Sequence, residues 1–215
     1  MPKPGSCWYG PTLPPPASSN PIEISSLHSI ENTACRIGHV IVPRRVILIL
    51  MGVVGAGKTT VGSLLAQKLG WQFADADDFH PAANVEKISH GIPLDDSDRG
   101  PWLSALRNAI LRWNAKNQNV ALACSALKRK YRDELRVDGV QFVYLKGDYE
   151  LIQKRLRARH GHFASESILK SQFADLEKPG AAITVEIDKS PEAIVAEIIE
   201  KLKASPVSHP DPAQK

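Results

Sequence analysis

The sequence predicts an α/β fold of three layers, in which a parallel sheet of about five strands is covered by helices on both faces. Two observations support this fold. Short apolar segments of strand length alternate along the chain with longer segments of helical periodicity, as in sheets built from right-handed β-α-β crossovers. The apolar run 46–51 leads directly into a glycine-rich loop and then a helix. Because parallel strands are buried on both faces, a continuous apolar run is their expected pattern.

The expected elements follow in order along the chain. The strands are expected at 46–51, 72–75, 120–124, 140–145 and 182–188. The helices are expected at 58–69, 82–89, 101–116, 128–136, 148–159, 165–177 and 191–203. Ligands of parallel sheets bind at the carboxyl ends of the strands, so the residues that follow each strand are the candidates for function.

Composition narrows the class of protein. The chain has 215 residues, of which 43% are hydrophobic and 23% charged, as in an ordinary soluble domain. A dispersed net charge of +4 predicts no nucleic-acid partner but suits anionic ligands. No apolar run approaches the ~20 residues of a membrane span. The odd, widely spaced cysteines (Cys7, Cys35 and Cys124) indicate free thiols and a cytoplasmic protein.

The two ends of the chain differ from its centre. Residues 1–44 are rich in Pro and Ser and are expected to form a disordered extension, unless the start codon was assigned too far upstream. Residues 45–204 form the expected folded domain. Residues 205–215, again rich in Pro, are expected to form a disordered tail.

The glycine-rich loop after the first strand carries the clearest functional signal. Residues 52–59 match G-x-x-x-x-G-K-[ST], a pattern that binds the phosphates of a nucleoside triphosphate. Glycines let the backbone N–H groups turn inward around phosphates, Lys58 can reach the β- and γ-phosphates, and the Thr59 hydroxyl can ligate Mg²⁺. The loop residues are Gly52, Val53, Val54, Gly55, Ala56, Gly57, Lys58 and Thr59.

Three carboxylates follow the second strand, at Asp75, Asp77 and Asp78. One of them can hold a metal ion or its waters, and another can accept the proton of an attacking hydroxyl. The alternative is a helix cap within a solvated acidic turn. Further along the chain, Pro101 is expected in the first turn of a helix capped by Asp98 or a neighbour. Arg99 faces either this anionic site or a surface ion pair.

The third and fourth strands are also followed by polar residues. After the third, Ser125 is placed to cap a helix and Lys128 to project from its first turn, whereas Cys124 is interpreted as a small buried residue. After the fourth, Arg155 and Arg159 share one helix face ahead of a glycine hinge at Gly161. This arrangement predicts a small lid that excludes water from phosphoryl transfer, and the alternative is a basic surface helix.

Taken together, these segments resemble the gluconokinase family over about residues 46–203. The most selective matches are His-Pro at 80–81, Asp-Arg-x-Pro-Trp-Leu at 98–103, Cys-Ser-Ala-Leu-Lys at 124–128 and Gly-His-Phe at 161–163. Further matching residues are Asn84, Lys87, Tyr131, Arg132, Arg155, Arg159, Gln172, Phe173 and Glu177. At Ala76 the family often has Gly.

The resemblance implies a P-loop kinase fold related to shikimate and adenylate kinases, with a small lid. It further implies a cytoplasmic, commonly dimeric enzyme that uses ATP and Mg²⁺ to phosphorylate D-gluconate at its terminal hydroxyl, giving 6-phosphogluconate. The residues carried over are Gly55, Gly57, Lys58, Thr59 and Thr60 for triphosphate and metal, Asp75 for the metal through water, Asp77 as base or hydroxyl orienter, His80, Arg99, Lys128 and His162 for the acceptor, and Arg155 and Arg159 for the lid.

Two other functions remain open from the sequence. One is a related small-molecule kinase that acts on shikimate, another sugar acid or a nucleoside monophosphate. The other is a nucleotide-dependent switch that binds partners and turns over slowly. The sequence has no Asn-Lys-x-Asp segment of the kind that binds guanine, and paired lid arginines suit a transfer reaction better than a switch.

Overall fold

The computed structural model describes residues 46–90, 92, 94–158 and 166–204, together with the backbone of two short upstream strands. These strands, β1 (Cys35–Ile37) and β2 (Val40–Val42), pair antiparallel. Both lie within the expected extension 1–44, whose other residues lie outside the described part of the chain, as does the expected tail 205–215. Disorder at the two ends of the chain therefore stays a prediction.

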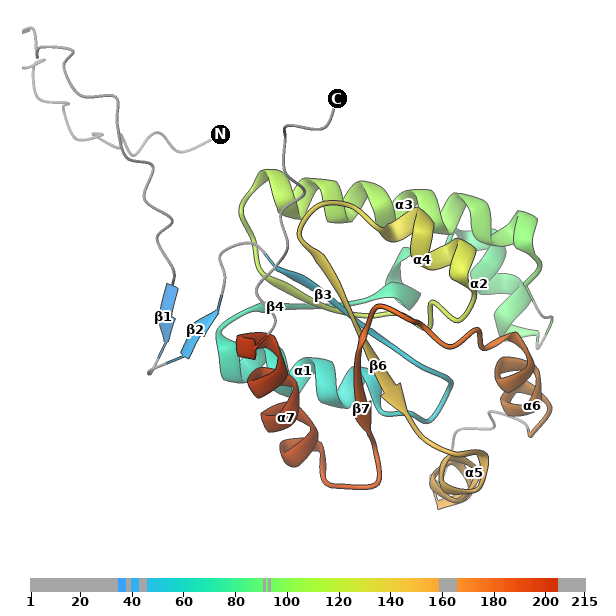
Figure 1. Cartoon of the computed structure of the whole chain (residues 1–215). Coiled ribbons are helices and arrows are strands. Elements are labelled where there is room, and N and C mark those ends of the chain that lie inside the picture. Colours follow the sequence, from blue (N-terminus) through green and yellow to red (C-terminus); the bar gives the residue numbers. More distant parts are fainter. Residues whose placement is uncertain are drawn as a thin grey trace, which may run out of the picture. The chain divides into compact units, whose positions relative to one another are not determined.

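A parallel sheet of five strands forms the centre of the domain, which confirms the predicted fold class (Figure 1). In chain order its strands are β3 (Ile47–Met51), β4 (Gln72–Asp75), β5 (Val120–Ala123), β6 (Val140–Lys146) and β7 (Ile183–Glu186). They pair in the order β4-β5-β3-β6-β7, all parallel. The chain leaves β3 toward the edge strand β4, whereas it leaves the adjacent β5 toward β6 on the other side of β3. Sheets of this kind bind ligands in the crevice between two such oppositely directed connections.

Helices cover both faces of this sheet, as predicted. They are α1 (Lys58–Leu69), the short 3₁₀ helix η1 (Ala76–Phe79), α2 (Ala82–Ser89), α3 (Asp96–Ala115), α4 (Arg129–Leu135), α5 (Tyr149–Ala158), α6 (Glu166–Asp175) and α7 (Pro191–Ala204). Figure 1 shows α1 and α7 on one face and α3 and α4 on the other, with α5 and α6 beyond the carboxyl end of β6. The loops that follow β3, β4, β5 and β6 lie at the carboxyl ends of the parallel strands, on one side of the sheet.

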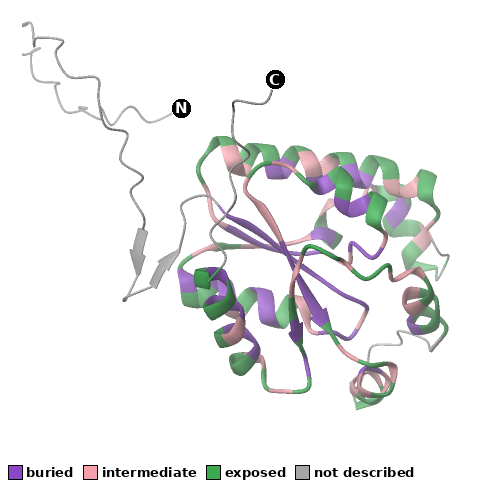
Figure 2. Ribbon diagram, viewed as in Figure 1, coloured by how far each residue is buried: buried purple, intermediate pink, exposed green. Residues whose placement is uncertain are grey.

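Alternate side chains of β3 pack into two different cores. Leu48 and Leu50 contact the cluster that contains the buried faces of α1 and α7, whereas Ile47 and Ile49 contact the cluster under α3 and α4. All five residues of β3 are buried (Figure 2). Burying each such side chain stabilises the fold by about 1.5–3 kcal/mol. The strand that carries the glycine-rich loop is thus held firmly from both faces.

The start of α3 differs from the prediction. The helix begins at Asp96, with Asp95 as its N-cap in a reciprocal capping box with Asp98. Pro101 therefore lies in the second turn rather than the first. Proline lacks the N–H that would donate to the Ser97 carbonyl. The two bonds of the capping box, each worth about 1 kcal/mol, offset part of that loss. The sequence pattern alone does not show that the helix begins at the acids and runs through the proline.

The start of α4 also differs from the prediction. The helix begins at Arg129, Lys128 holds the N-cap position without a side-chain bond, and Ser125 is not the cap. The Arg129 N–H instead donates to the Glu177 carboxylate at 2.6 Å. A residue 48 positions away in sequence takes over the role that a local serine was expected to play.

Candidate active site

The glycine-rich loop joins β3 to α1 at the carboxyl edge of the sheet. A Cβ at Gly52 would lie 2.9 Å from the Leu145 carbonyl oxygen, and a Cβ at Gly55 would lie 3.0 Å from carbons of Ile152 and Leu156. Gly55 also has φ of +82°, which disfavours any side chain. The close packing on β6 and α5 therefore requires these two glycines.

The first turn of α1 follows this loop directly. The N-cap, Gly57, makes no side-chain cap bond, and a helix N-terminus presents backbone N–H groups and a partial positive charge to an anion. The ammonium of Lys58 donates to the Val53 carbonyl at 3.1 Å and so lies over the loop. This combination is typical of a phosphate site.

The Thr59 hydroxyl connects this loop to the acidic turn after β4. It donates to the Asp75 carboxylate at 2.9 Å, and the same carboxylate accepts the Asp77 N–H at 3.2 Å. Asp75 therefore caps η1 and also contacts the loop. The turn can thus be a helix cap and still supply a carboxylate to the site. A hydroxyl beside a carboxylate suits Mg²⁺ that arrives with a nucleotide, since the phosphates and water supply its other ligands.

Asp77, the predicted base, has a raised pKa. The residue is exposed to solvent, yet enough protein surrounds its carboxyl that burial raises its pKa above 3.8, and repulsion from Asp75 adds to this. His80 and Lys58 lie near enough to oppose the shift. A carboxylate with a raised pKa accepts a proton more readily than an ordinary one.

His80 lies against the aromatic ring of Trp102. The rings are stacked with centroids 4.8 Å apart and planes 10° from parallel. The Trp102 indole N–H donates to the Ala76 carbonyl at 2.8 Å, which fixes the stack to η1. Asn84, a buried side chain, contacts the imidazole at 3.4 Å. Trp102 and Asn84 belong to matched sequence segments, but composition and spacing assigned them no role.

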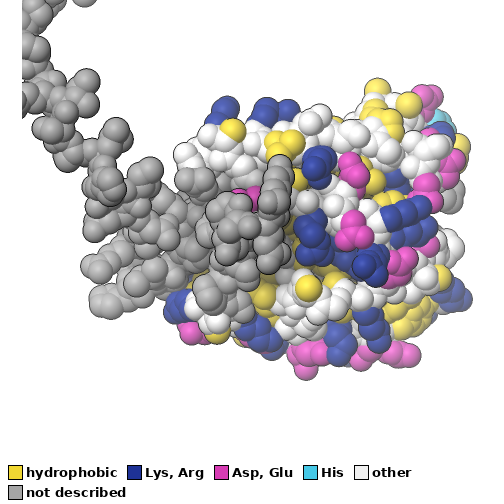
Figure 3. Space-filling model, turned by 45° about the horizontal axis from the view of Figure 1, so that its top comes forward, with side chains coloured by type: hydrophobic (Ala, Val, Ile, Leu, Met, Phe, Trp, Pro, Cys, Tyr) yellow, Lys and Arg dark blue, Asp and Glu magenta, His cyan; other side chains and the backbone are white. Residues whose placement is uncertain are grey.

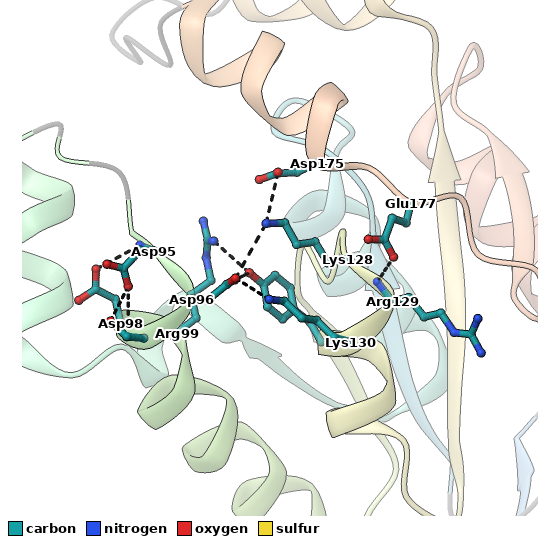
Figure 4. A network of polar contacts seen from close by, with 11 residues as sticks. Asp95, Asp96, Asp98, Arg99, Lys128, Arg129, Lys130, Asp175 and Glu177 are labelled. Carbon is teal, nitrogen blue, oxygen red and sulfur yellow. Dashed lines mark hydrogen bonds and ion pairs between the residues drawn. The ribbon is translucent and has the colours of Figure 1, made fainter.

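Arg99 and Lys128 take part in one charged network that joins α3, α4 and α6 (Figure 4). Arg99 donates to the Tyr131 hydroxyl at 3.0 Å, and that hydroxyl donates to Asp96 at 2.5 Å. Lys128 lies 3.4 Å from Asp175 and 4.0 Å from Asp96. Figure 4 shows Lys128 directed toward Asp175 from one side of the network. The predicted acceptor contacts Arg99 and Lys128 are thus brought together.

Three basic side chains of the network lie beside two of its carboxylates. Lys130 also bonds Asp96 at 2.5 Å, so Arg99, Lys128 and Lys130 face the two carboxylates of Asp96 and Asp175. The bonds from Lys130 and then Tyr131 lower the pKa of Asp96 to about 2. Burial, followed by the bond to Asp96, raises the pKa of Tyr131 to about 12. At neutral pH Asp96 is therefore ionised and the Tyr131 hydroxyl is protonated, and the basic side chains of Arg99, Lys128 and Lys130 lie around them.

The lid residues are only partly described. Arg155 donates from its guanidinium to the Ile187 carbonyl, beyond the end of β7. Arg159, Gly161 and His162 lie outside the described part of the chain, so their predicted roles stay predictions. From α6, the Gln172 side chain accepts the Val54 N–H of the glycine-rich loop at 2.6 Å. Gln172 thus joins the segment after the predicted lid directly to the loop, a contact that the sequence did not reveal.

Cys124 is a structural residue, as predicted. It is 2% exposed in the core under α3 and α4, and burial raises its pKa to about 12. A thiol with such a pKa is protonated and unreactive at neutral pH. Arg132, also buried, donates to the carbonyls of Ala126 and Leu127 and so holds the loop that leads to Lys128.

The described residues also bear on metal binding and on membrane insertion. Among them, no group of three or more His, Cys, Asp or Glu side chains is arranged to hold a metal ion alone. No helix in the described ranges is long and apolar enough to cross a membrane. On the face drawn in Figure 3, Lys and Arg side chains are interspersed with Asp and Glu side chains.

Comparison with known proteins connects this geometry to a family. Residues 54–203 match the family model described as shikimate kinase. A protein of Xenopus tropicalis named "Probable gluconokinase" is 46% identical over 173 residues, which cover 71% of this chain and 90% of that protein. The thermoresistant gluconokinase of Escherichia coli is 45% identical over 163 residues, which cover 73% of this chain and 93% of that protein.

The fold comparison agrees with the sequence comparison. The crystal structure of a gluconokinase from Sinorhizobium meliloti superimposes with a TM-score of 0.68 and 37% sequence identity, covering 74% of this chain and 93% of that one. The resemblance inferred from the sequence motifs is therefore confirmed. The chain belongs to the gluconokinase family, within the P-loop kinases that the shikimate kinase model describes.

Proposed function

We propose that this protein is a gluconokinase, which transfers the γ-phosphoryl group of ATP to the terminal hydroxyl of D-gluconate and forms 6-phospho-D-gluconate. One observation carries the proposal. Arg99, which interacts electrostatically with His80 beside Asp77, also belongs to the charged network with Lys128, so two basic side chains are available to hold an anionic acceptor next to the phosphate loop. Family membership supports both substrates.

On the donor side, the glycine-rich loop and the start of α1 (residues 52–60) hold the triphosphate, and the Lys58 ammonium neutralises the β- and γ-phosphates. Mg²⁺ bound with the nucleotide would supply further neutralisation, held by the Thr59 hydroxyl and, through water, by Asp75. The 2.9 Å contact between those two side chains supports this pairing. Thr60, the next residue in α1, completes the expected nucleotide contacts.

On the acceptor side, Asp77 orients the attacking hydroxyl and accepts its proton, while Arg99 and Lys128 bind the gluconate carboxylate and His80 binds a hydroxyl. His162 is a further expected contact. Arg155 and Arg159 neutralise the separating phosphates from the lid, which requires Arg155 to exchange its bond to the Ile187 carbonyl for a phosphate oxygen. Phosphoryl transfer depends mainly on such positioning and charge stabilisation.

A panel of acceptors tests the substrate. With ATP and Mg²⁺, we expect kcat/KM for D-gluconate to exceed that for shikimate, glycerate, other sugar acids and nucleoside monophosphates by at least about a hundredfold, because a site built for several hydroxyls leaves polar groups unpaired with a poorer match. Comparable values for gluconate and shikimate would exclude the assignment to gluconate. Fast GTP hydrolysis without any acceptor would instead favour a nucleotide-dependent switch.

Replacement of Tyr131 by phenylalanine tests the acceptor network. The phenol oxygen is the partner of Arg99 at 3.0 Å, and its loss leaves the guanidinium less constrained. We expect KM for gluconate to rise about three- to tenfold, with KM for ATP within about twofold of wild type. Steady-state kinetics with each substrate varied in turn gives both values. Equal changes in the two KM values would contradict a role at the acceptor.

The remaining expectations concern the oligomeric state of the protein and its compartment in the cell. The resemblance to a cytoplasmic, commonly dimeric family supports a homodimer in the cytoplasm. Cys124 is a free buried thiol, which suits a reducing compartment. Sedimentation at several protein concentrations would establish the oligomeric state.

A further inference from the structure

Asn84 is unusual among the polar residues of the described chain. Only Asn84 and Arg132 are polar or charged side chains that are buried there, each 4% exposed. A buried amide must satisfy its hydrogen-bonding groups, or it costs the fold about 1–3 kcal/mol. The side-chain nitrogen of Asn84 has two partners, the Asp98 carbonyl at 2.8 Å and Nδ1 of His80 at 3.4 Å.

These two contacts determine which nitrogen of His80 carries the proton. The Asp98 carbonyl can only accept, so the atom of Asn84 that faces it must be the amide nitrogen. That same nitrogen faces Nδ1 of His80 with its second N–H. Nδ1 therefore accepts, and in a neutral imidazole the proton must then be on Nε2.

The environment also keeps His80 neutral and fixes the plane of its ring. Burial lowers the pKa of His80 below 6.5, and Arg99 lowers it further, while Asp77 opposes both. The stack on Trp102 holds the plane of the ring, and the indole bond to the Ala76 carbonyl holds Trp102. The imidazole is thus anchored by two neighbours, with Nε2 as its remaining polar atom.

We propose that Asn84 is a positioning residue that holds His80 as the Nε2–H tautomer, so that His80 donates a hydrogen bond to a hydroxyl oxygen of the acceptor. His80 then leaves the role of proton acceptor to Asp77. With His80 as hydrogen-bond donor and Asp77 as proton acceptor, the two side chains do not compete for the same proton. The acceptor part of the proposal rests on the proposed kinase function, whereas the tautomer does not.

Nitrogen NMR of the ¹⁵N-histidine-labelled full-length protein, without any substrate, tests the tautomer. The chain has seven histidines, and the His80 signals are those missing from the spectrum of His80→Gln. We expect an Nε2–H imidazole in the wild type. In Asn84→Asp the new carboxylate accepts from Nδ1, so the proton is expected to move to Nδ1. An Nδ1–H tautomer in the wild type would overturn the proposal, as would no change in Asn84→Asp.

Two replacements of His80 form a matched pair that tests the second part of the proposal, the hydrogen bond from Nε2 to the acceptor. The amide nitrogen of Gln reaches about the position of Nε2, whereas that of Asn reaches about the position of Nδ1. Both variants lose the stack on Trp102, so we expect both to lose activity, with kcat/KM for gluconate about tenfold or more lower in His80→Asn than in His80→Gln, the effect of one hydrogen bond. Equal losses in the two variants, or better activity in His80→Asn, would contradict donation from Nε2. If the wild-type protein shows the Nε2–H tautomer but does not phosphorylate gluconate, the proposed kinase function is wrong and the tautomer assignment still holds.

Discussion

Replacement of Lys58 by alanine is expected to lower kcat/KM at least about a hundredfold. The Lys58 ammonium lies over the phosphate loop, bonded to the Val53 carbonyl at 3.1 Å, where it can follow the charge that moves onto the β-phosphate oxygens during transfer. Loss of one such preorganised group raises the barrier by about 3 kcal/mol or more. Steady-state turnover of ATP with gluconate measures the effect.

A second lysine on the same helix provides the control. Lys68 is exposed in the last turn of α1, so Lys68→Ala removes the same side chain from the same helix without touching the site. We expect that variant to keep wild-type rates. Near-normal turnover in folded Lys58→Ala, with Tm unchanged, would show that the loop does not bind the transferred phosphate as proposed.

Replacement of Asp77 by asparagine is expected to lower kcat by about 10²–10⁴-fold, the range for loss of a general base. The affinity for ATP should change little, because the proposed partner of Asp77 is the acceptor hydroxyl. ATP titration by calorimetry with Mg²⁺ separates the two effects. Asp78→Asn is the matched control, since Asp78 is exposed in the same turn and has no assigned role. An unchanged kcat in Asp77→Asn would show that another group accepts the proton.

The raised pKa of Asp77 gives this variant a second signature. Because the folded pKa lies above 3.8, the folded state binds the proton more tightly than the unfolded chain does. The stabilisation is therefore complete below the unfolded pKa and is lost as pH rises through the folded pKa. At pH 7 the ionised carboxylate lowers stability, so Asp77→Asn is expected to have a Tm equal to or above that of the wild type. In the wild type, kcat should fall as pH drops through the raised pKa, and this acid limb should be absent from the variant.

The elements could be predicted because each depends on local pattern. The apolar run at 46–51 and the helical spacing of Val61, Leu64, Leu65 and Leu69 are read directly along the chain, and the structure buries all of them except Leu64, which is partly buried. The glycine-rich loop is likewise one continuous segment. Where two local signals conflicted, as at the start of α3, the helix begins at the capping box of Asp95 and Asp98 and runs through Pro101, and the simple pattern was wrong.

The contacts that tune the site could not be predicted in this way. Asn84 meets Asp98 across 14 positions, Arg99 meets Tyr131 across 32, and Gln172 meets Val54 across 118. Each contact depends on how helices pack against the sheet, which no spacing within one segment reveals. The motifs showed that these residues belong to a selective pattern, but not which atom each one touches.

For this protein the order of residues is sufficient for the α/β class, the phosphate loop and the list of polar residues after each strand, because periodicity and glycine placement act over a few neighbouring positions. The pairing of Lys128 with Asp175, the stack of His80 on Trp102 and the burial of Asn84 follow only from the folded chain. Burial and charge energies depend on the distance through space between groups, and folding sets that distance regardless of their separation in sequence.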